Sequence, residues 1–270
     1  MKIHFKDMKN QCPLQYYSRQ MISRQMRIKD AQKRRMRGYK STAVHIEHLM
    51  NFPNYDSEIR SILPHYDTFH AETINLVLSV LPEPEAWLDT GCGTGTLVER
   101  ALRLLPTTRF FLADPSVEMM DVAKRKLSGS KRVTFLKPSC TQDITPEGVG
   151  IGSFDVVTAI QSHHYLSKEE RARATGACRY LLKEGGIFVT FENVRPLTAK
   201  GTKIGKQLWK RHQLDSGREP QTVESHIERF GRVFFPLTVE EHLSLLRMAG
   251  FSVVELLWYS CMQAGFYCVK

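Results

Sequence analysis

The chain has 270 residues, enough for one α/β domain with additions and barely enough for two domains. Hydrophobic residues make up 42% of it, and no apolar run reaches the roughly 18 residues that a membrane-spanning helix needs. The net charge of +10 lies entirely within residues 1–40, which hold twelve Lys and Arg against two Asp and Glu. The rest carries 26 residues of each sign, and this neutrality argues against a nucleic-acid-binding surface on the main domain.

The cysteines and the N-terminus indicate a cellular compartment. No pair forms a Cys-x-x-Cys motif and no cysteine stands in a Cys/His cluster, which predicts reduced thiols rather than a disulfide framework or a metal site. The first residues are polar and basic, without the apolar stretch of a secretory signal. We therefore expect a cytoplasmic protein that binds no metal and no membrane. The six cysteines are Cys12, Cys92, Cys140, Cys178, Cys261 and Cys268.

Residues 1–64 are expected to form a basic helical arm that ends in a lid segment. Apolar residues recur with loosely helical spacing over 16–37, and residues 33–37 form a short basic run. That run suits either RNA or another anionic partner, or a solvated helix face. We favour the solvated face, because base-stacking aromatic residues are limited to Tyr16, Tyr17 and Tyr39.

The most informative stretch is residues 86–116. A helix predicted over 66–81 ends before Pro82, and a short apolar strand then stops at Asp89. A turn with glycines at 91, 93 and 95 leads into a helix, and a second apolar strand ends in Asp114. Glycines allow a ligand to approach the backbone closely, and an acid at the tip of the second strand can accept both hydroxyls of a ribose.

This pattern resembles motif I of the class I S-adenosylmethionine-dependent methyltransferases. The family motif, acid-x-Gly-x-Gly-x-Gly, is matched by Asp89, Gly91, Gly93 and Gly95, and Asp114 stands for the second-strand acid. A nicotinamide dinucleotide site is the rival interpretation, but its Gly-x-Gly-x-x-Gly fingerprint lacks the third glycine here. The resemblance implies S-adenosylmethionine as the cofactor.

The resemblance also implies a set of cofactor-binding residues. The segment 54–66 is similar to a cofactor-covering segment of many family members and, loosely, to the enzyme that makes carboxy-S-adenosylmethionine. Its Tyr55, Arg60 and Tyr66 are candidates for lid residues or for aromatic packing. The acid that family members often place after strand three is absent from residues 137–141. The full predicted set is Tyr55, Asp89, Thr90, Gly91, Cys92, Gly93, Asp114, Pro115, Met119, Ser139, Cys140 and Gln161.

Candidates for a general base follow the next two strands. A strand predicted over 153–160 leads to Gln161, His163 and His164, and a strand over 187–191 leads to Glu192. An unperturbed imidazole titrates near pH 6.5, which suits a base, although adjacent histidines do not easily face one site. We favour His163 slightly; a histidine that only packs in the core is the alternative. Many methyltransferases need little acid–base assistance, because the sulfonium already activates the methyl group.

The residues from 167 to 270 are expected to complete the domain. Capping boxes start helices at residues 167–170 and 238–241, and residues 251–259 and 262–269 form a hairpin. Residues 194–236 interrupt the core, and the resemblance suggests a cap over the substrate. We expect a doubly wound, Rossmann-like α/β fold with a seven-stranded, mostly parallel sheet, an antiparallel C-terminal hairpin strand and an N-terminal helical extension. The methyltransferase domain would span residues 65–270.

Three functions are compatible with these features. The first is methyl transfer to a small-molecule acceptor, favoured by the neutral body and the expected cap. The second is modification of RNA, such as transfer RNA, with the basic arm on the phosphates. The third is binding of S-adenosylmethionine without turnover. Neither the methylated atom nor the oligomeric state follows from the sequence.

Overall fold

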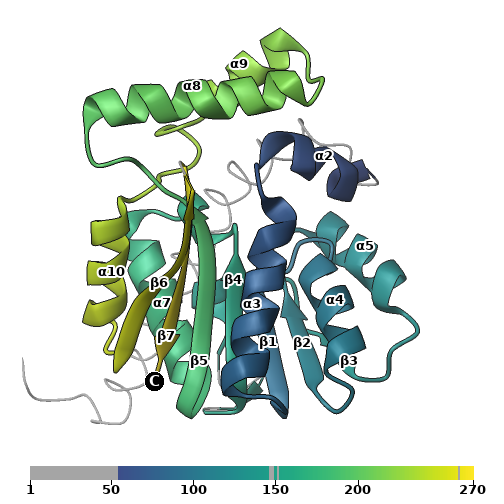
Figure 1. Cartoon of the computed structure of the whole chain (residues 1–270). Coiled ribbons are helices and arrows are strands. Elements are labelled where there is room, and N and C mark those ends of the chain that lie inside the picture. Colours follow the sequence, from purple (N-terminus) through teal and green to yellow (C-terminus); the bar gives the residue numbers. More distant parts are fainter. Residues whose placement is uncertain (1–53, 146–148, 151, 261) are drawn as a thin grey trace, which may run out of the picture. The chain divides into compact units, whose positions relative to one another are not determined.

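The computed structural model describes residues 54–145, 149–150, 152–260 and 262–270 (Figure 1). The chain divides into a unit of residues 1–50 and a unit of residues 51–270. The helix predicted over 16–37 and the basic run therefore lie outside the described residues. The segment 54–64, predicted as part of the arm, belongs to the larger unit together with the sheet.

The described strands form one seven-stranded sheet in the order β3-β2-β1-β4-β5-β7-β6. The first five strands in this order run parallel, and β7 is antiparallel to both of its neighbours. The predicted doubly wound, seven-stranded α/β fold is therefore confirmed, whereas the predicted N-terminal helical extension lies outside the described residues. The strands are β1 (Ala86–Thr90), β2 (Arg109–Ala113), β3 (Val133–Phe135), β4 (Phe154–Ile160), β5 (Leu182–Asn193), β6 (Val253–Ser260) and β7 (Gln263–Val269).

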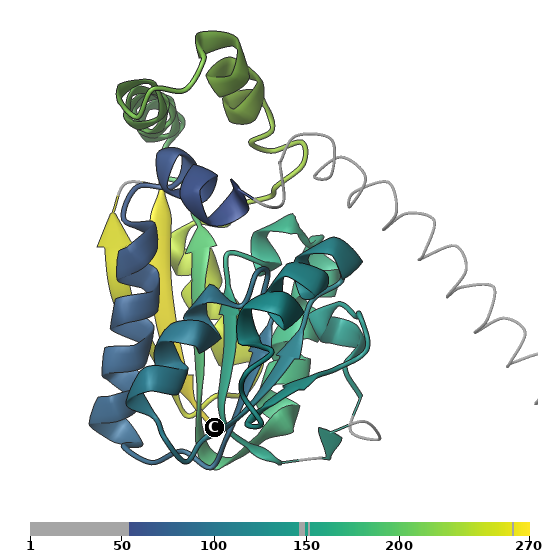
Figure 2. The same cartoon turned by 90° about the vertical axis from the view of Figure 1, so that its right-hand side faces the viewer.

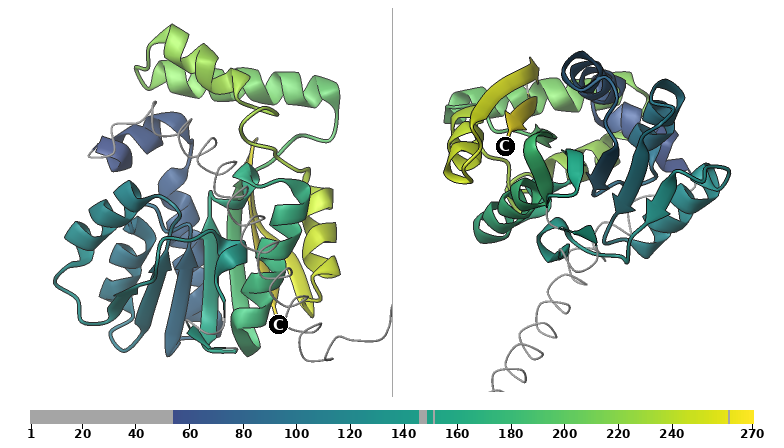
Figure 3. Two further views of the ribbon diagram at one scale, coloured as in Figure 1. Left: turned by 180° about the vertical axis from the view of Figure 1, so that it is seen from behind. Right: turned by 90° about the horizontal axis from the view of Figure 1, so that it is seen from below.

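Helices cover both faces of this sheet (Figure 3). On one face, α3 (Tyr66–Val80), α4 (Thr96–Leu104) and α5 (Val117–Leu127) pack on β1 and β2 around the fully buried Trp87 and Phe110. On the other face, α7 (Lys168–Leu181) and α10 (Val239–Met248) pack around Phe154, Phe188 and Phe266. A strand covered on both faces has no polar side, which explains why all five residues of β1 are buried.

The strand β5 is longer than the predicted 187–191. It begins at Leu182, directly after α7, and pairing with β4 resumes at Ile187 after an irregularity in the register. Gly185 and Gly186 lie within this interruption of the pairing with β4, and Gly185 takes a left-handed backbone conformation with φ of 75°. Two adjacent glycines indicate a turn, but the extension of β5 back to Leu182 depends on its pairing with β4.

Residues 199–228 form two helices, α8 (Ala199–Asp215) and α9 (Pro220–Glu228), which lie beyond the carboxyl ends of the parallel strands (Figures 1 and 2). The short helix α2 (Tyr55–Ile62) lies between α8 and the sheet. Trp209 Nε1 donates a hydrogen bond of 2.6 Å to the carbonyl of Ile62, and His212 Nε2 is 3.2 Å from the carbonyl of Arg60. These contacts join α8 to α2.

Both predicted capping boxes are present. The side chain of Ser167 accepts from the backbone of Glu170, whose carboxylate accepts from Ser167 in return. Thr238 and Glu241 make the same reciprocal pair at the start of α10. Ser116 also caps α5 and accepts from the backbone N–H of Met119. None of the described helices is long and apolar enough to span a bilayer.

Candidate functional site

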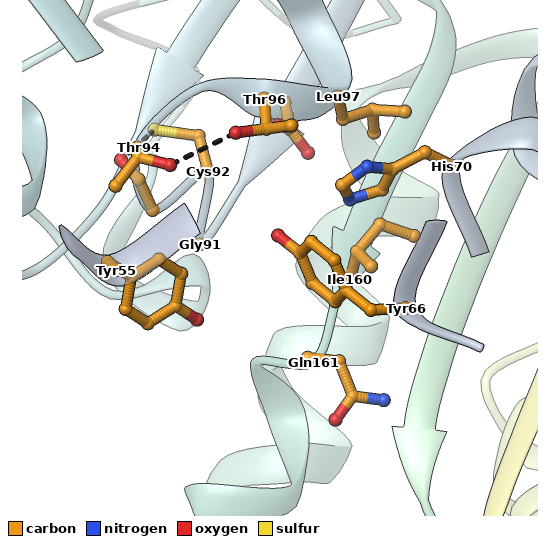
Figure 4. Close-up of a pocket in the computed structure, with 12 residues that line it drawn as sticks. Tyr55, Tyr66, His70, Gly91, Cys92, Thr94, Thr96, Leu97, Ile160 and Gln161 are labelled. Carbon is orange, nitrogen blue, oxygen red and sulfur yellow. Dashed lines mark hydrogen bonds between the residues drawn. The ribbon is translucent and has the colours of Figure 1, made fainter. Parts of the chain in front are cut away.

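A pocket lies at the carboxyl ends of β1 and β4, where ligands bind in open parallel sheets (Figure 4). Its walls come from α2, α3, the glycine turn after β1, the first turn of α4 and the end of β4. The lining residues are Tyr55, Tyr66, His70, Asp89, Gly91, Cys92, Gly93, Thr94, Thr96, Leu97, Ile160 and Gln161.

The glycine turn is shaped by its backbone. Gly91 and Gly93 have φ of 66° and 53°, a left-handed region that residues with a Cβ rarely adopt. A Cβ on Gly91 would lie 2.4 Å from the Cβ of Ser162, so this glycine lets the end of β4 pack on the turn. A Cβ on Gly93 would meet no atom within 4 Å, which leaves the backbone at this point open to a ligand.

Asp89, the penultimate residue of β1, is a buried carboxylate on the wall of the pocket. It is only 2% exposed, and it accepts a hydrogen bond of 2.7 Å from the hydroxyl of Thr158 on β4. Burial raises the pKa of Asp89 to about 7, and the hydrogen bond from Thr158 opposes that rise. The negative charge of Asp114 adds to it. The site therefore contains a carboxylate that lacks a cationic partner.

Asp114 lies at the end of β2 and contacts the glycine turn directly. Its carboxylate accepts from the backbone N–H of Gly93 at 2.9 Å and from that of Ser116 at 2.8 Å. Burial raises its pKa to about 6, against these two hydrogen bonds. Asp114 does not line the pocket itself, but it approaches the pocket through Gly93, which does.

The two acids give the site a strong preference for a cation. Among the described residues that line the pocket there is no Lys or Arg. A desolvated carboxylate is costly unless an opposite charge compensates it. A positively charged ligand would supply that compensation, whereas a pyrophosphate would add to the repulsion.

Gln161, which follows β4, is held in a strained conformation. Its φ is 55°, unusual for a residue other than glycine, and its backbone N–H donates to the carbonyl of Phe191 at 2.6 Å. Its side-chain Nε2 is buried and has no hydrogen-bond partner among the described residues. Strain of this kind together with an unsatisfied donor is typical of ligand-binding positions.

Asp56, which was not among the residues predicted for the site, joins the helix α2 to the glycine turn. One oxygen of Asp56 accepts from the hydroxyls of Thr94 at 2.5 Å and Thr96 at 2.9 Å. The other accepts from Lys126 Nζ on α5 at 2.5 Å. Partial burial tends to raise the pKa of Asp56, but the hydrogen bonds from Lys126 and Thr94 lower it overall. The neighbouring Tyr55 is thereby held at the pocket.

The predicted base candidates lie in a buried cluster outside the set of residues that line the pocket. His163 Nε2 is 3.1 Å from the hydroxyl of Thr141, and its ring stacks on Phe188. Burial lowers the pKa of His163 to about 4. His164 donates through Nδ1 to Glu192 at 2.7 Å, and both side chains are 1% exposed. The structure thus brings the three candidates together at the ends of β4 and β5.

The other predicted cofactor residues are not among those that line the pocket. The hydroxyl of Thr90 donates to the carbonyl of Thr158 and so faces the sheet. The backbone N–H of Ser139 donates to the carbonyl of Asp114 at 3.2 Å, which places the loop that follows β3 next to Asp114. The members of the predicted set that do not line the pocket are Thr90, Asp114, Pro115, Met119, Ser139 and Cys140.

Several residues that line the pocket were not in the predicted set. Tyr66 was singled out as a lid candidate, and His70 follows it by four residues on the same helix face. That spacing was a usable signal for His70. Thr94 and Thr96 lie inside the motif, but their partner Asp56 is 38 and 40 residues away, so only the folded chain reveals the contact.

Comparisons with known proteins agree with this geometry. Residues 88–188 match the model of a methyltransferase domain family. The chain is 24% identical over 204 residues to a carboxy-S-adenosyl-L-methionine synthase of Trichodesmium erythraeum, covering 75% of this chain and 79% of that protein. It is 32% identical over 111 residues to a malonyl-[acyl-carrier protein] O-methyltransferase of Halalkalibacterium halodurans, covering 40% of each.

Two solved structures share the fold. A putative O-methyltransferase of Nostoc punctiforme superposes with a TM-score of 0.55 at 16% identity, covering 76% of this chain and 56% of that one. Human N-acetylserotonin methyltransferase in complex with S-adenosylmethionine superposes with a TM-score of 0.53 at 16% identity, covering 80% of this chain and 57% of that one.

The residues present suit S-adenosylmethionine. Its sulfonium and ammonium groups would supply the positive charge that compensates the buried carboxylates of Asp89 and Asp114. The open backbone at Gly93 allows the ligand to approach the turn closely. Asp89 would hold the ammonium and Asp114 the ribose hydroxyls, as the resemblance implies. With this pocket and this sheet order, residues 88–188 match a methyltransferase domain, and the chain has the fold of solved methyltransferases.

Proposed function

We propose that this protein transfers the methyl group of S-adenosylmethionine to a small-molecule acceptor held beneath α8 and α9. The observation that supports this most is the pair of buried acids, Asp89 and Asp114, on either side of the glycine turn. The described residues that line the adjoining pocket include no Lys or Arg. The cap helices support a small acceptor, because they lie beyond the strand ends and are tied to α2 through Trp209.

In the mechanism that we propose, the chain contributes binding and position. The cofactor supplies an electrophilic methyl group on a sulfonium, so the protein's task is alignment and exclusion of water. Asp89 and Asp114 bind the charged and hydroxylated parts of the cofactor. Tyr55 and Tyr66 cover the pocket from α2 and α3, and the strained Gln161 faces it from β4.

His163, His164 and Glu192 are assigned a positioning role. Glu192 accepts from the backbone N–H groups of His163 at 3.1 Å and His164 at 2.8 Å, which fixes the chain immediately after Gln161. A general base at His163 or His164 would require the imidazole to leave this buried cluster when the acceptor binds. In our proposal the reaction proceeds without such a base.

A second candidate is suggested by the relatives named carboxy-S-adenosyl-L-methionine synthase, which match most of the chain at low identity. A carboxylated sulfonium group carries an additional negative charge, which a cationic side chain would stabilise. The absence of Lys and Arg from the described lining residues favours transfer of a plain methyl group. RNA modification, with the basic residues 1–40 as the binding arm, is a third candidate.

The experiment that separates these candidates uses the full chain with S-adenosylmethionine labelled at the methyl group. Calorimetry first measures cofactor binding, and the enzyme is then incubated with a metabolite fraction below roughly 1 kDa or with total RNA. We expect label in a small molecule and release of S-adenosylhomocysteine, both absent from an Asp114→Ala variant. Label in RNA, or a carboxylated cofactor in the mass spectrum, would replace our assignment with the corresponding candidate.

A further inference from the structure

The cap, residues 194–236, is the basic part of an otherwise neutral domain. It holds nine Lys and Arg against four Asp and Glu, whereas residues 41–270 as a whole hold 26 of each sign. The pocket at the ends of β1 and β4 has the opposite sign, because Asp89 lines it and none of the described lining residues is Lys or Arg. The site therefore has an anionic end at the glycine turn and a cationic end in the cap.

Arg229, at the end of α9, is a partly buried cation of this cap. Its guanidinium carbon lies 5.9 Å from the centroid of the Phe234 ring, a cation–π contact that restricts the side chain. Other cap cations, Arg195, Lys210 and Arg211, each pair with a carboxylate, but Arg229 has no such partner among the described residues. A charge that loses water without gaining a counterion is costly, and an anionic ligand would remove that cost.

The loop after α9 holds Arg229 next to the segment that follows β4. The backbone N–H of Phe235 donates to the carbonyl of His164 at 2.7 Å. The ring of Phe234 packs against His164 and Tyr165, with 6.0 and 6.4 Å between centroids. Arg229 therefore has a fixed place beside Tyr165 and is not an exposed, freely rotating side chain.

Tyr165 connects Arg229 with the pocket. Burial raises the pKa of Tyr165, and the positive charge of Arg229 opposes this rise. Burial also raises the pKa of Tyr55, which lines the pocket, and the neighbouring Tyr66 and Tyr165 add to the rise. The hydroxyls of Tyr55 and Tyr165 have no hydrogen-bond partner in the part of the chain that the structure describes. Two unpartnered hydroxyls thus lie between the pocket and the guanidinium.

A second guanidinium adds to the cationic end. Arg218, between α8 and α9, donates to the side-chain oxygen of Gln213. Burial lowers the pKa of Arg218, the charge of Glu58 on α2 opposes this, and the charge of Arg229 adds to the lowering. The pKa of His226 is lowered to about 3 by burial and by both arginines. Two cations this close to one another repel, and a bound anion would relieve the repulsion.

We propose that Arg229, with Arg218 beside it, binds an anionic group of the methyl acceptor, a carboxylate or a phosphate. The charges also orient the acceptor, because its anionic group is attracted to the cap and repelled by Asp89, which leaves its other end towards the pocket. The methylated atom is therefore not part of the anionic group, and the product keeps its negative charge. This inference rests on the proposed function, since it names the chemical class of the acceptor.

The first test is calorimetry on the full chain saturated with S-adenosylhomocysteine, with benzoate, phenyl phosphate and neutral benzamide as probes. All three carry the same ring, so differences between them report the charge. We expect at least one of the two anions to bind at least about 10-fold more tightly than benzamide. Arg229→Gln should weaken binding of that anion by roughly 10- to 100-fold, the range for a hydrogen bond to a charged group, and Arg229→Lys should restore part of the affinity.

Arg232 offers a matched control. It belongs to the same loop as Arg229, but its side chain is exposed and contacts no ring among the described residues. Arg232→Gln removes the same charge and should leave the affinity for each probe as in the wild type. Thermal unfolding of each variant without ligand reports folding separately.

A second measurement separates this inference from the proposed function. The enzyme is incubated with methyl-labelled S-adenosylmethionine and a metabolite fraction, and we expect an anion-exchange column at neutral pH to retain the labelled product. Label in an uncharged or cationic small molecule would overturn the anion site while the proposed function stands. The same holds for three probes that bind equally or not at all, and for equal losses in Arg229→Gln and Arg232→Gln. Label in no small molecule would overturn the proposed function itself, and this inference with it.

Discussion

Glu192 at the end of β5 and His164 after β4 are joined by two hydrogen bonds, one from Nδ1 at 2.7 Å and one from the backbone N–H at 2.8 Å. The same carboxylate accepts from the backbone of His163 and from the hydroxyl of Thr190. Burial alone would raise the pKa of Glu192, but the hydrogen bond and charge of His164 lower it to about 2. A fully buried charge is thus stabilised by donors from β5 itself and from the segment that follows β4.

We predict that Glu192→Ala destabilises the fold by roughly 3–5 kcal/mol, the usual cost of breaking a buried pair from one side. Urea unfolding monitored by circular dichroism measures this loss. Because the folded pKa is about 2 and the ordinary value is 4.5, the contribution of Glu192 is present above pH 4.5 and is lost as the pH falls towards 2. Glu184→Ala is the control, since its side chain is 85% exposed. Similar effects of the two substitutions would contradict this account.

We expect His163→Phe to retain turnover within about tenfold of the wild type once an acceptor is known. The reason is that His163 is buried against Phe188 and bonded to Thr141, outside the set of pocket-lining residues. A general base contributes about 10²- to 10⁴-fold, so steady-state kinetics distinguishes the two roles. A loss of that size with unchanged cofactor affinity and stability would identify His163 as the base.

Asp114→Ala should lower the affinity for S-adenosylmethionine at least about 100-fold, as expected for the loss of two charge-assisted hydrogen bonds. The fold should persist, because the backbone N–H groups that Asp114 accepts from, those of Gly93 and Ser116, lie in turns and belong to no strand pairing. Calorimetry gives the affinity, and Asp121→Ala, an exposed acid on α5, is the matched control. An unchanged affinity would refute the ribose assignment.

Asp89→Asn should stabilise the cofactor-free protein while it abolishes cofactor binding. The folded pKa of Asp89, about 7, exceeds the ordinary 3.8, so proton binding favours the native state and this stability is lost as the pH rises through 7. The variant should therefore be more stable than the wild type at pH 8, by at most about 4 kcal/mol, and equal near pH 4. Unfolding curves at both pH values test this; a variant that is less stable at pH 8 would exclude it.

Wild-type affinity for the cationic cofactor should also fall as the pH drops below about 7, because protonation removes first the charge of Asp89 and then that of Asp114. Calorimetry between pH 8 and pH 5.5 measures this dependence. An affinity that is constant between pH 8 and pH 5.5 would show that binding does not depend on the protonation of either carboxylate.

Lys126→Met should loosen the lid helix α2. Lys126 and the hydroxyls of Thr94 and Thr96 hold Asp56, and with it Tyr55, over the pocket. We expect both association and dissociation rates of S-adenosylmethionine to rise, by a factor of about 5–10, for loss of a partly buried ion pair worth about 1 kcal/mol. Stopped-flow fluorescence measures the rates. Lys124→Met, which breaks an exposed pair on the same helix, should leave both rates unchanged.

The sequence by itself determined the fold class and the central motif. Apolar runs that stop at Asp89 and Asp114 mark buried parallel strands, and the glycines between them require a tight turn, because these signals depend on residues close together in the chain. The capping boxes at Ser167 and Thr238 were visible for the same reason. Local physical chemistry fixed these features.

The tertiary structure decided which side chains face the ligand. Glu192 lies near the end of β5 and His163 follows β4, yet neither lines the pocket: Glu192 accepts from the backbone of His163, and the ring of His163 bonds to Thr141. His70 lines the pocket because α3 packs beside the glycine turn, and Asp56 meets Lys126 across 70 residues. Burial and pairing of polar groups depend on long-range packing, and no local pattern of residues encodes it.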